Sequence, residues 1–310
     1  MNSLNQSSFG ENLDTSVGRL SSRGDTEKML MPETDPEQMK LAIQAVIQHL
    51  MDRVMHRVLV QDPFITEKFH AEKPLYAALV PDEIFKGAHF ERRFVTPFGS
   101  AWEDLAVASA QFGLGRAIKG HNVFGKVKTG RLTRIAEVLN TLEHPARGKE
   151  RTKPDWSREL AYVLAGSGQD VPVQIMCDVY AEDIATGRKY AFELKAPLPN
   201  SDISKVSKEK LLKLYAMEPL EVDEAYFALP YNPYRTRDNY SWSFPARWFN
   251  MKSDKVVLIG DEFWEKIGGA GTYQAFIAAV NEIGKEYRTR IYQEFLGIEP
   301  PLEPGQIELQ

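Results

Sequence analysis

Two carboxylates and a lysine, Asp178, Glu193 and Lys195, stand in two neighbouring apolar runs of the chain. The runs cover residues 171–182 and 188–196, and their length and composition predict two strands. Side chains on a strand alternate between its two faces, so Glu193 and Lys195 point the same way. These residue types could together hold a cation and act on a bound substrate.

The segment Ile-Ala-Thr-Gly, residues 184–187, predicts a hairpin turn that joins the two strands. A turn centred on this segment places Asp178 directly opposite Glu193, with Cβ atoms about 5 Å apart. On an arbitrary hairpin, these two side chains and Lys195 would form a solvated salt-bridge surface. The apolar residues around them, among them Phe192, instead favour a central position in a sheet.

Such a cluster predicts metal-assisted hydrolysis. Paired carboxylates are usual ligands for Mg²⁺, and the backbone carbonyl of Leu194 would add another oxygen, so the predicted metal ligands are Asp178, Glu193 and Leu194. Mn²⁺ would substitute for Mg²⁺. The ion would lower the pKa of a bound water and stabilise a leaving group. Lys195 would orient or deprotonate that water, or stabilise a pentavalent phosphorus. We therefore expect hydrolysis of phosphodiester bonds.

The composition bounds the class of protein. The 310 residues are 43% hydrophobic and 11% aromatic, which suits a globular core. The net charge of -5 means that any nucleic-acid surface must be a local concentration of positive charge. The single cysteine, Cys177, excludes an internal disulfide and a cysteine-based zinc site, and suits a reducing cytoplasm. With neither a run of about 20 apolar residues nor a secretory signal, we expect a cytoplasmic protein without a membrane partner.

The chain divides into three predicted parts: a disordered or loosely ordered arm over 1–34, a single domain over 35–298 and a tail over 299–310. Within the domain, residues 35–165 are expected to be mainly helical with a basic loop, and residues 171–298 to form an α/β core. Periodicity and capping signals predict helices over 35–60, 100–112, 132–142, 201–217, from Asp261 and over 272–295, and further strands over 224–229 and 256–260.

Basic or polar side chains gather in three segments. Residues 105–136 contain no acid and five glycines, and are expected to form a flexible basic loop. The helix over 201–217 would carry lysines on one arc and Ile203, Val206, Leu211 and Leu214 on the other. A third group follows the strand over 224–229. We expect these segments to contact DNA phosphates, and their Arg or Asn side chains to contact bases. The alternative is that each segment is an ordinary solvent-exposed surface. The candidate DNA-binding residues are Lys126, Lys128, Arg131, Lys205, Lys208, Lys213, Asn232, Tyr234, Arg235 and Arg237.

Two other motifs are rejected. Residues 120–126 read G-x-x-x-x-G-K, but Val127 replaces the Ser or Thr that a nucleotide-binding loop needs, and no clear strand precedes it. We therefore expect no nucleotide cofactor. The six histidines show no spacing typical of metal ligands.

The sequence resembles the PD-(D/E)XK nuclease signature: Asp178 is followed, after fourteen residues, by Glu193-Leu194-Lys195. Cys177 stands where the motif's name has Pro. The strand–strand–helix–strand order also resembles that fold's core. Residues 192–197, 208–212 and 230–234 are similar to type II restriction endonucleases in particular. The resemblance covers about residues 85–290, most clearly 171–270.

The resemblance implies an α/β fold with a mixed central β-sheet flanked by helices and a helical N-terminal region. It implies a Mg²⁺-dependent, sequence-specific endonuclease that cuts double-stranded DNA to leave 5′-phosphates. It also implies a homodimer, because a two-fold protein matches a palindromic site. The alternatives are a structure-specific repair or recombination nuclease of the same fold, or a DNA-binding protein without catalysis.

Glu103 has two interpretations. In many enzymes of this kind, a helix before the sheet supplies a further acidic residue, and Glu103 is the candidate for that catalytic role. Equally, Ser100 and Glu103 form a capping-box pattern, in which Glu103 would only stabilise the start of a helix. Glu137 is a second, less favoured candidate.

Overall fold

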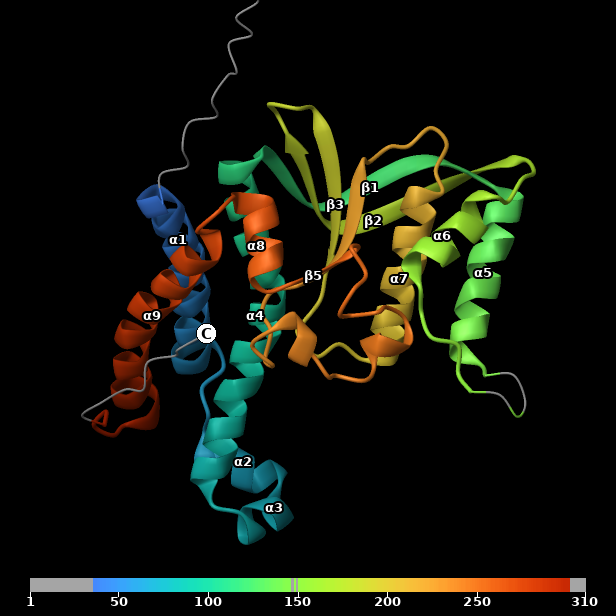
Figure 1. The fold of residues 1–310 in the computed structure, drawn as a ribbon. Coiled ribbons are helices and arrows are strands. Elements are labelled where there is room, and N and C mark those ends of the chain that lie inside the picture. Colours follow the sequence, from blue (N-terminus) through green and yellow to red (C-terminus); the bar gives the residue numbers. More distant parts are fainter. Residues whose placement is uncertain (1–35, 146–147, 149, 302–310) are drawn as a thin grey trace, which may run out of the picture. The chain divides into compact units, whose positions relative to one another are not determined.

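A computed structural model describes residues 36–145, 148 and 150–301, and a five-stranded mixed sheet lies at its centre (Figure 1). The strands follow one another in chain order, β1-β2-β3-β4-β5. The first two pairings are antiparallel, and β3–β4 and β4–β5 are parallel. The strands are β1 (Gly115–Lys128), β2 (Asp170–Asp183), β3 (Arg188–Leu194), β4 (Glu224–Leu229) and β5 (Val257–Ile259).

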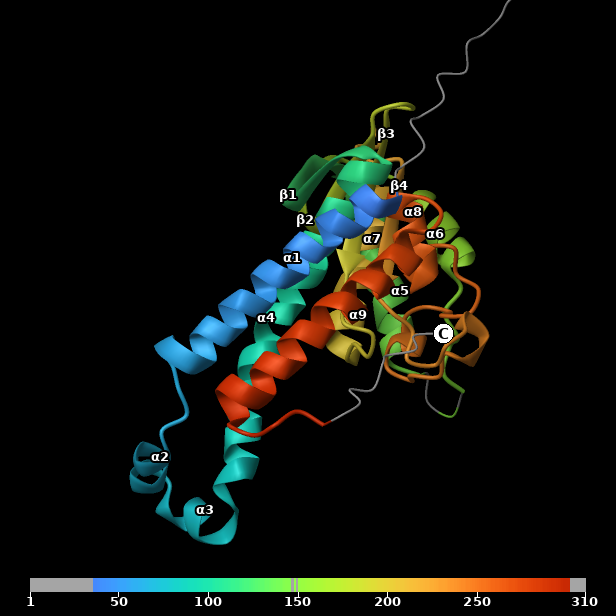
Figure 2. The ribbon, with the colours of Figure 1, turned by 90° about the vertical axis from the view of Figure 1, so that its left-hand side faces the viewer.

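Helices cover both faces of the sheet. Two clusters of buried apolar side chains separate the faces: one joins the sheet to α1, α4, α8 and α9, and the other joins it to α5, α6 and α7. The helices are α1 (Pro36–His56), α2 (Thr66–Glu72), α3 (Pro74–Leu79), α4 (Asp82–Gly113), α5 (Thr129–Glu143), α6 (Trp156–Leu164), α7 (Ser201–Tyr215), α8 (Asp261–Gly268) and α9 (Thr272–Arg290). The helix α1 packs against both α4 and α9, as Figures 1 and 2 show. The predicted fold class is confirmed.

Short helical segments complete the described chain. A π-helical turn over Arg57–Gln61 continues α1 and another over Ile291–Leu296 continues α9. Two 3-10 turns, Arg237–Asn239 and Pro245–Arg247, lie in the long connection between β4 and β5. No helix in the described part of the chain is long and apolar enough to cross a membrane.

The described residues from Pro36 onward belong to one compact unit. The predicted N-terminal arm over 1–34 lies outside the described residues, and so does most of the predicted tail over 299–310.

The β2–β3 hairpin has the predicted register. Its ladder begins with Asp183 opposite Arg188 and continues to Val179 opposite Phe192, so the turn is centred on residues 184–187 as expected. The side chain of Asp183 stabilises the turn by accepting bonds from within that segment, one of them 2.6 Å long from a threonine hydroxyl. One further step along this register places Asp178 opposite Glu193.

The prediction of a flexible basic loop over 105–136 is wrong. Its centre is β1, which pairs with β2 from Gly115–Asp183 to Lys128–Asp170. At least two of its glycines allow close packing rather than flexibility, since a Cβ on Gly113 or Gly130 would lie within 2.4 Å of a backbone carbonyl oxygen. Pairing with a distant strand overrode the local composition.

The predicted helix start at Ser100 is also wrong. Ser100 lies inside α4, which runs from Asp82 to Gly113 through Pro97. Leu105 is buried as expected, but Phe112 is exposed. The capping-box interpretation therefore fails, because no helix begins at this point.

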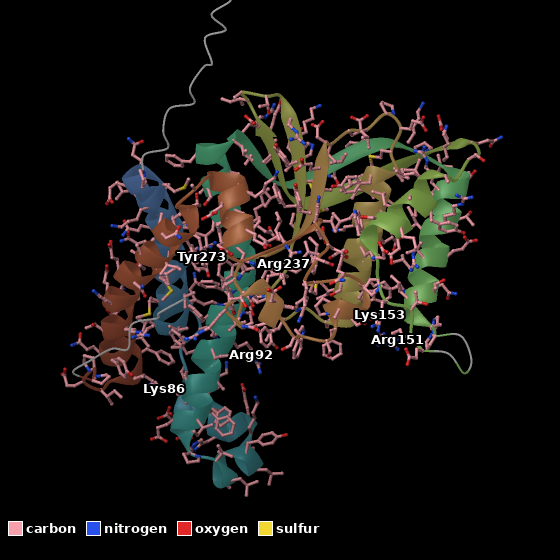
Figure 3. All side chains as sticks on the ribbon, in the orientation of Figure 1. Lys86, Arg92, Arg151, Lys153, Arg237 and Tyr273 are labelled. Atoms are coloured by element: carbon pink, nitrogen blue, oxygen red, sulfur yellow. The ribbon has the colours of Figure 1, made fainter. Side chains whose placement is uncertain are left out.

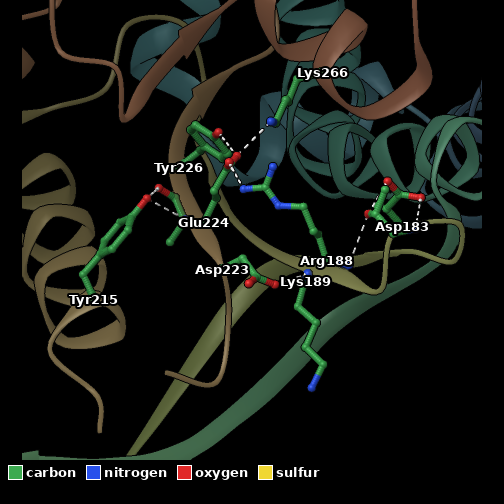
Figure 4. Close-up of polar contacts among 10 residues, drawn as sticks. Asp183, Arg188, Lys189, Tyr215, Asp223, Glu224, Tyr226 and Lys266 are labelled. Carbon is green, nitrogen blue, oxygen red and sulfur yellow. Dashed lines mark hydrogen bonds and ion pairs between the residues drawn. The ribbon is translucent and has the colours of Figure 1, made fainter. Parts of the chain in front are cut away.

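At the other end of β3 from Lys195, a polar network ties β3, β4 and α8 together (Figure 4). Glu224 accepts bonds from Arg188, from Tyr226 and, at 2.8 Å, from Lys266 of α8. The main-chain N–H of Lys189 donates to Asp223 over 2.7 Å. Burial raises the pKa of Glu224, but these hydrogen bonds and cations outweigh burial and hold it below its usual value.

Candidate active site

Asp178, Glu193 and Lys195 meet at the C-terminal end of β3. The Nζ atom of Lys195 lies 2.6 Å from Asp178 Oδ2 and 2.8 Å from Glu193 Oε1. The main-chain N–H of Leu194 donates to Asp178 Oδ2 over 2.8 Å, so the β2 carboxylate is bonded to the backbone of β3. The side chain of Leu194 points away into the core, as predicted. The residues brought together by the hairpin register are thus in direct contact.

Glu193 is 3% exposed and receives a second ammonium group. The Nζ atom of Lys210 on α7 lies 3.0 and 2.8 Å from its two carboxylate oxygens. Ser207 adds a hydroxyl 3.5 Å from Oε1. Lys210 was not among the predicted site residues. One signal could have found it: α7 follows β3 directly in the chain and packs against β4, so a lysine on its inner face can reach the neighbouring strand β3.

Lys195 is held in its ammonium form. Burial lowers the pKa of Lys195, but the nearby Glu193 and Asp178 carboxylates outweigh burial and raise it above the usual lysine value. In this state Lys195 can donate hydrogen bonds and stabilise negative charge. It could act as a base only if the two carboxylates moved away, because they favour its protonated form.

Glu103 of α4 lies at the margin of the same cluster. Its carboxylate is 3.4 Å from Lys119, which also binds Asp104 at 2.7 Å. Burial raises the pKa of Glu103, the Lys119 ammonium opposes this, and the negative charge of Asp178 adds to it. That coupling shows that Glu103 and the β2 carboxylate are electrostatic neighbours. Glu137, by contrast, accepts a bond from Tyr162 on α6.

The donor set fits a hard divalent cation. Asp178 and Glu193 both approach one ammonium nitrogen, so a single cation already bridges their oxygens. Mg²⁺ is bound through one or two carboxylates and keeps several waters or substrate phosphates. Among the described residues no group of three or more His, Cys, Asp or Glu side chains is arranged to hold a metal. The protein would therefore supply the two carboxylates and a main-chain oxygen as metal ligands.

Comparison with known proteins decides the family. Residues 39–284 match the family model described as "Type II restriction endonuclease, HinfI". The chain belongs to this HinfI family of type II restriction endonucleases. It is therefore a site-specific deoxyribonuclease, and the predicted resemblance to type II restriction endonucleases is confirmed.

Named relatives agree with this assignment. The type II restriction enzyme HgiCII of Herpetosiphon aurantiacus is 26% identical over 231 residues, which cover 72% of this chain and 82% of the relative. The type II restriction enzyme HgiBI of the same organism is 24% identical over 234 residues, covering 72% of this chain and 81% of the relative.

In this HinfI-family enzyme, the expectation that Lys208 contacts DNA is wrong. Lys208 is fully buried, and its ammonium lies 2.5 Å from Glu159 Oε2 and also bonds the Trp248 carbonyl. Burial lowers the pKa of Lys208 and raises that of Glu159. The predicted apolar arc of α7 was partly misplaced: Ile203 and Val206 are exposed, whereas the buried positions include Ser204, Ser207, Lys208, Leu211 and Leu214.

The other predicted cations, on α7, β1 and α5, mostly have protein partners. Lys205 binds Glu143 at 2.5 Å, and Lys213 binds Glu209 at 2.6 Å. Lys128 and Arg131 share Glu218 at 3.2 Å each. Lys126 is exposed. Among the described residues, none of these cations is paired with Asp178 or Glu193, whose ion-pair partners are Lys195 and Lys210.

In the loop after β4, Arg237 has a structural role. Its guanidinium donates to the carbonyls of Met251 and Asp254 and to the carboxylate of Glu262, so it would contact DNA only by giving up these partners. The side chain of Asn232 accepts the N–H of Tyr234, whose ring packs on a buried tyrosine. Arg235 is exposed.

Three exposed cations were missed by sequence reasoning. Figure 3 labels Arg92 on α4, and Arg151 and Lys153 on the segment that joins α5 to α6. Within the described part of the chain none of the three forms an ion pair. Arg151 and Lys153 belong to a basic run over residues 147–153, and this local signal could have revealed them.

Proposed function

We propose that this HinfI-family enzyme uses Mg²⁺, for which Mn²⁺ can substitute, to hydrolyse double-stranded DNA and leave 5′-phosphates. The contact of Asp178 and Glu193 with one ammonium nitrogen supports the proposal most directly, because it shows two carboxylates close enough to share a cation. When bound, the ion lowers the pKa of a water and stabilises the leaving oxygen.

The chain's own residues have distinct roles in this proposal. Asp178, Glu193 and the carbonyl of Leu194 hold the cation. Lys195 leaves the two carboxylates, orients the attacking water and stabilises the charge that develops at phosphorus. Water adds to phosphorus and the bond to the 3′ oxygen breaks, so the phosphate stays on the 5′ end.

Two further groups support this chemistry. Lys210 binds the Glu193 carboxylate from α7 and neutralises it until the cation takes those oxygens. Glu103 acts as an additional acidic residue, poised beside Asp178 and restrained by Lys119. Glu103 is thus a positioning residue in this proposal.

DNA binding rests on exposed cations rather than on those already paired. We propose Arg92, Lys126, Arg151, Lys153 and Arg235 as phosphate contacts, since each is exposed. Four other cations would contact phosphates only by giving up a carboxylate partner: Lys128, Arg131, Lys205 and Lys213. Asn232 and Tyr234 remain candidates to contact bases from the loop after β4.

The enzyme is further proposed to be a homodimer, since two copies related by a two-fold axis can cut both strands of a palindromic site. Its lone buried cysteine and its DNA substrate support a cytoplasmic location.

Digestion of phage DNA tests the proposal. With Mg²⁺ the protein should yield discrete bands whose ends carry 5′-phosphates, and chelation of divalent ions should stop the reaction. Smeared or junction-specific products would instead indicate a structure-specific nuclease, and absence of cleavage with any divalent ion would contradict the proposal. Light scattering should give twice the mass of one chain.

A further inference from the structure

A pocket of about 430 Å³ adjoins Lys195. One wall is a stretch of α4, and the other is the chain that leaves β3, together with a tyrosine that follows β4. No role proposed above uses this space. The lining residues are Phe94, Val95, Phe98, Gly99, Trp102, Leu194, Lys195, Ala196, Pro197 and Tyr231.

The pocket walls are mainly aromatic. Phe94, Phe98 and Trp102 recur at every fourth position, which places them on one face of α4. The Phe94 and Phe98 ring centroids are 5.2 Å apart, and those of Phe98 and Trp102 are 5.0 Å apart. The ring of Tyr231 lies 5.8 Å from Trp102 and joins this row from the loop after β4. The row offers flat apolar surfaces to an occupant.

The charges around the pocket exclude most ionic occupants. Its one charged lining residue is Lys195, whose ammonium is already held by Asp178 and Glu193. No carboxylate lines the pocket, so a cation has no ligand there. An anion would meet aromatic walls and the nearby carboxylates. A flat, uncharged aromatic ring fits best, and the volume lies in the roughly 300–1,000 Å³ range of small-molecule pockets.

We propose that the pocket receives a nucleobase that leaves the DNA stack beside the scissile phosphate. The proposal rests on the function proposed above, because Lys195 belongs both to the pocket wall and to the site where the phosphate reacts. A sugar ties each base to its phosphate, so a base displaced next to the cut is held near this pocket. Bases stack on aromatic side chains, and enzymes that extrude a base bind it in such pockets.

Two glycines of α4 provide a matched test. Gly99 lines the pocket, Gly87 does not, and an added Cβ at either position meets nothing within 4 Å. Both lie inside one helix, where leucine is a better helix former than glycine. Gly99→Leu should fill the pocket, and Gly87→Leu should leave it open, with both variants folded.

The cut position is first mapped by sequencing the ends of cleaved phage DNA; this step also tests the proposed endonuclease activity separately. Dissociation constants are then measured in Ca²⁺ buffer for matched duplexes and for duplexes mispaired at each nucleotide that flanks the cut. A mispair reduces the work of unstacking, so at one position wild-type protein and Gly87→Leu should bind roughly tenfold more tightly. Gly99→Leu should lose this gain and cleave matched DNA at least several-fold more slowly.

Two results would overturn the pocket proposal while leaving the endonuclease intact. One is the absence of any gain from mispairs in wild-type protein that cuts DNA. The other is a Gly99→Leu variant with the same gain and the same cleavage rate as Gly87→Leu. Failure of wild-type protein to cut at all would contradict the proposed function itself.

Discussion

Lys208 and Lys210 lie two residues apart on α7, and each binds a glutamate, yet their surroundings differ. Lys208 is fully buried with Glu159, in a closed set that includes the Trp248 carbonyl. Lys210 is partly exposed, and the Glu193 carboxylate that it binds is shared with Lys195. The first pair is complete, whereas the second can exchange a partner.

The difference separates a structural ion pair from a reactive one. Ions removed from water need every hydrogen bond satisfied, so the Glu159–Lys208 pair stabilises the fold only as an intact unit. The cluster at Glu193 contains two ammonium groups at one carboxylate, so an incoming cation can replace an ammonium without leaving that carboxylate unpaired. Burial and exchangeability, rather than residue type, therefore distinguish the two regions.

The largest effect on activity is expected at the exchangeable cluster. Glu193→Ala and Lys195→Ala should each lower the cleavage rate by roughly 10²–10³-fold, because each removes a charged group from the reacting centre. Rates are measured on a linear DNA with one site, at equal amounts of folded protein. The control is Lys68→Ala, whose ammonium lies 3.9 Å from Glu72 on the same exposed helix, α2, and which has no role in the proposed site. A normal rate for either active-site variant would mean that the site has been misassigned.

The largest effect on stability is expected at the closed pair. Lys208→Met should lower the free energy of unfolding by about 3–5 kcal/mol, because Glu159 is left buried without its cation. Urea denaturation measures the loss. Adding Glu159→Leu should recover most of it, since no buried charge then remains. An undiminished stability in the single variant would show that the pair is not structural, and cleavage by the folded variant should stay near normal.

A smaller effect is expected at Lys210. Lys210→Gln removes an ammonium that competes for the Glu193 oxygens, so the Mg²⁺ concentration for half-maximal cleavage should fall. The change should be at least about tenfold, since a hydrogen bond to a charged group is worth about 1.5–3 kcal/mol and about 1.4 kcal/mol is a factor of ten. A titration of the cleavage rate with Mg²⁺ measures it. A higher Mg²⁺ requirement would indicate instead that Lys210 chiefly positions Glu193.

The smallest effect is a pH dependence at Glu103. Burial raises the pKa of Glu103, so its ionised form is disfavoured in the folded protein. Its contribution to stability is present below the unfolded pKa and is lost as the pH rises through the folded pKa. Glu103→Gln should match wild-type stability near pH 4 and exceed it slightly near pH 8, in metal-free urea denaturation. A less stable variant at pH 8 would show that the ion pair with Lys119 outweighs burial.

Local pattern was enough to place the central hairpin. The turn over 184–187 and the apolar runs around it specify a register, and a register specifies which side chains face each other. The contact of Asp178, Glu193 and Lys195 follows from that pairing. The strand β4 was likewise predicted at its observed bounds.

The remaining features depend on partners far away in the chain. β1 is a strand because β2 pairs with it across the intervening residues 129–169, and the glycines and lysines of β1 do not predict this pairing. Lys208 is buried and Lys210 reaches the active strand because of what packs on each side of α7. Glu103 lies beside Asp178 because α4 packs against β1 and β2. Residue order sets local pairing, whereas burial and charge pairing are properties of three-dimensional packing.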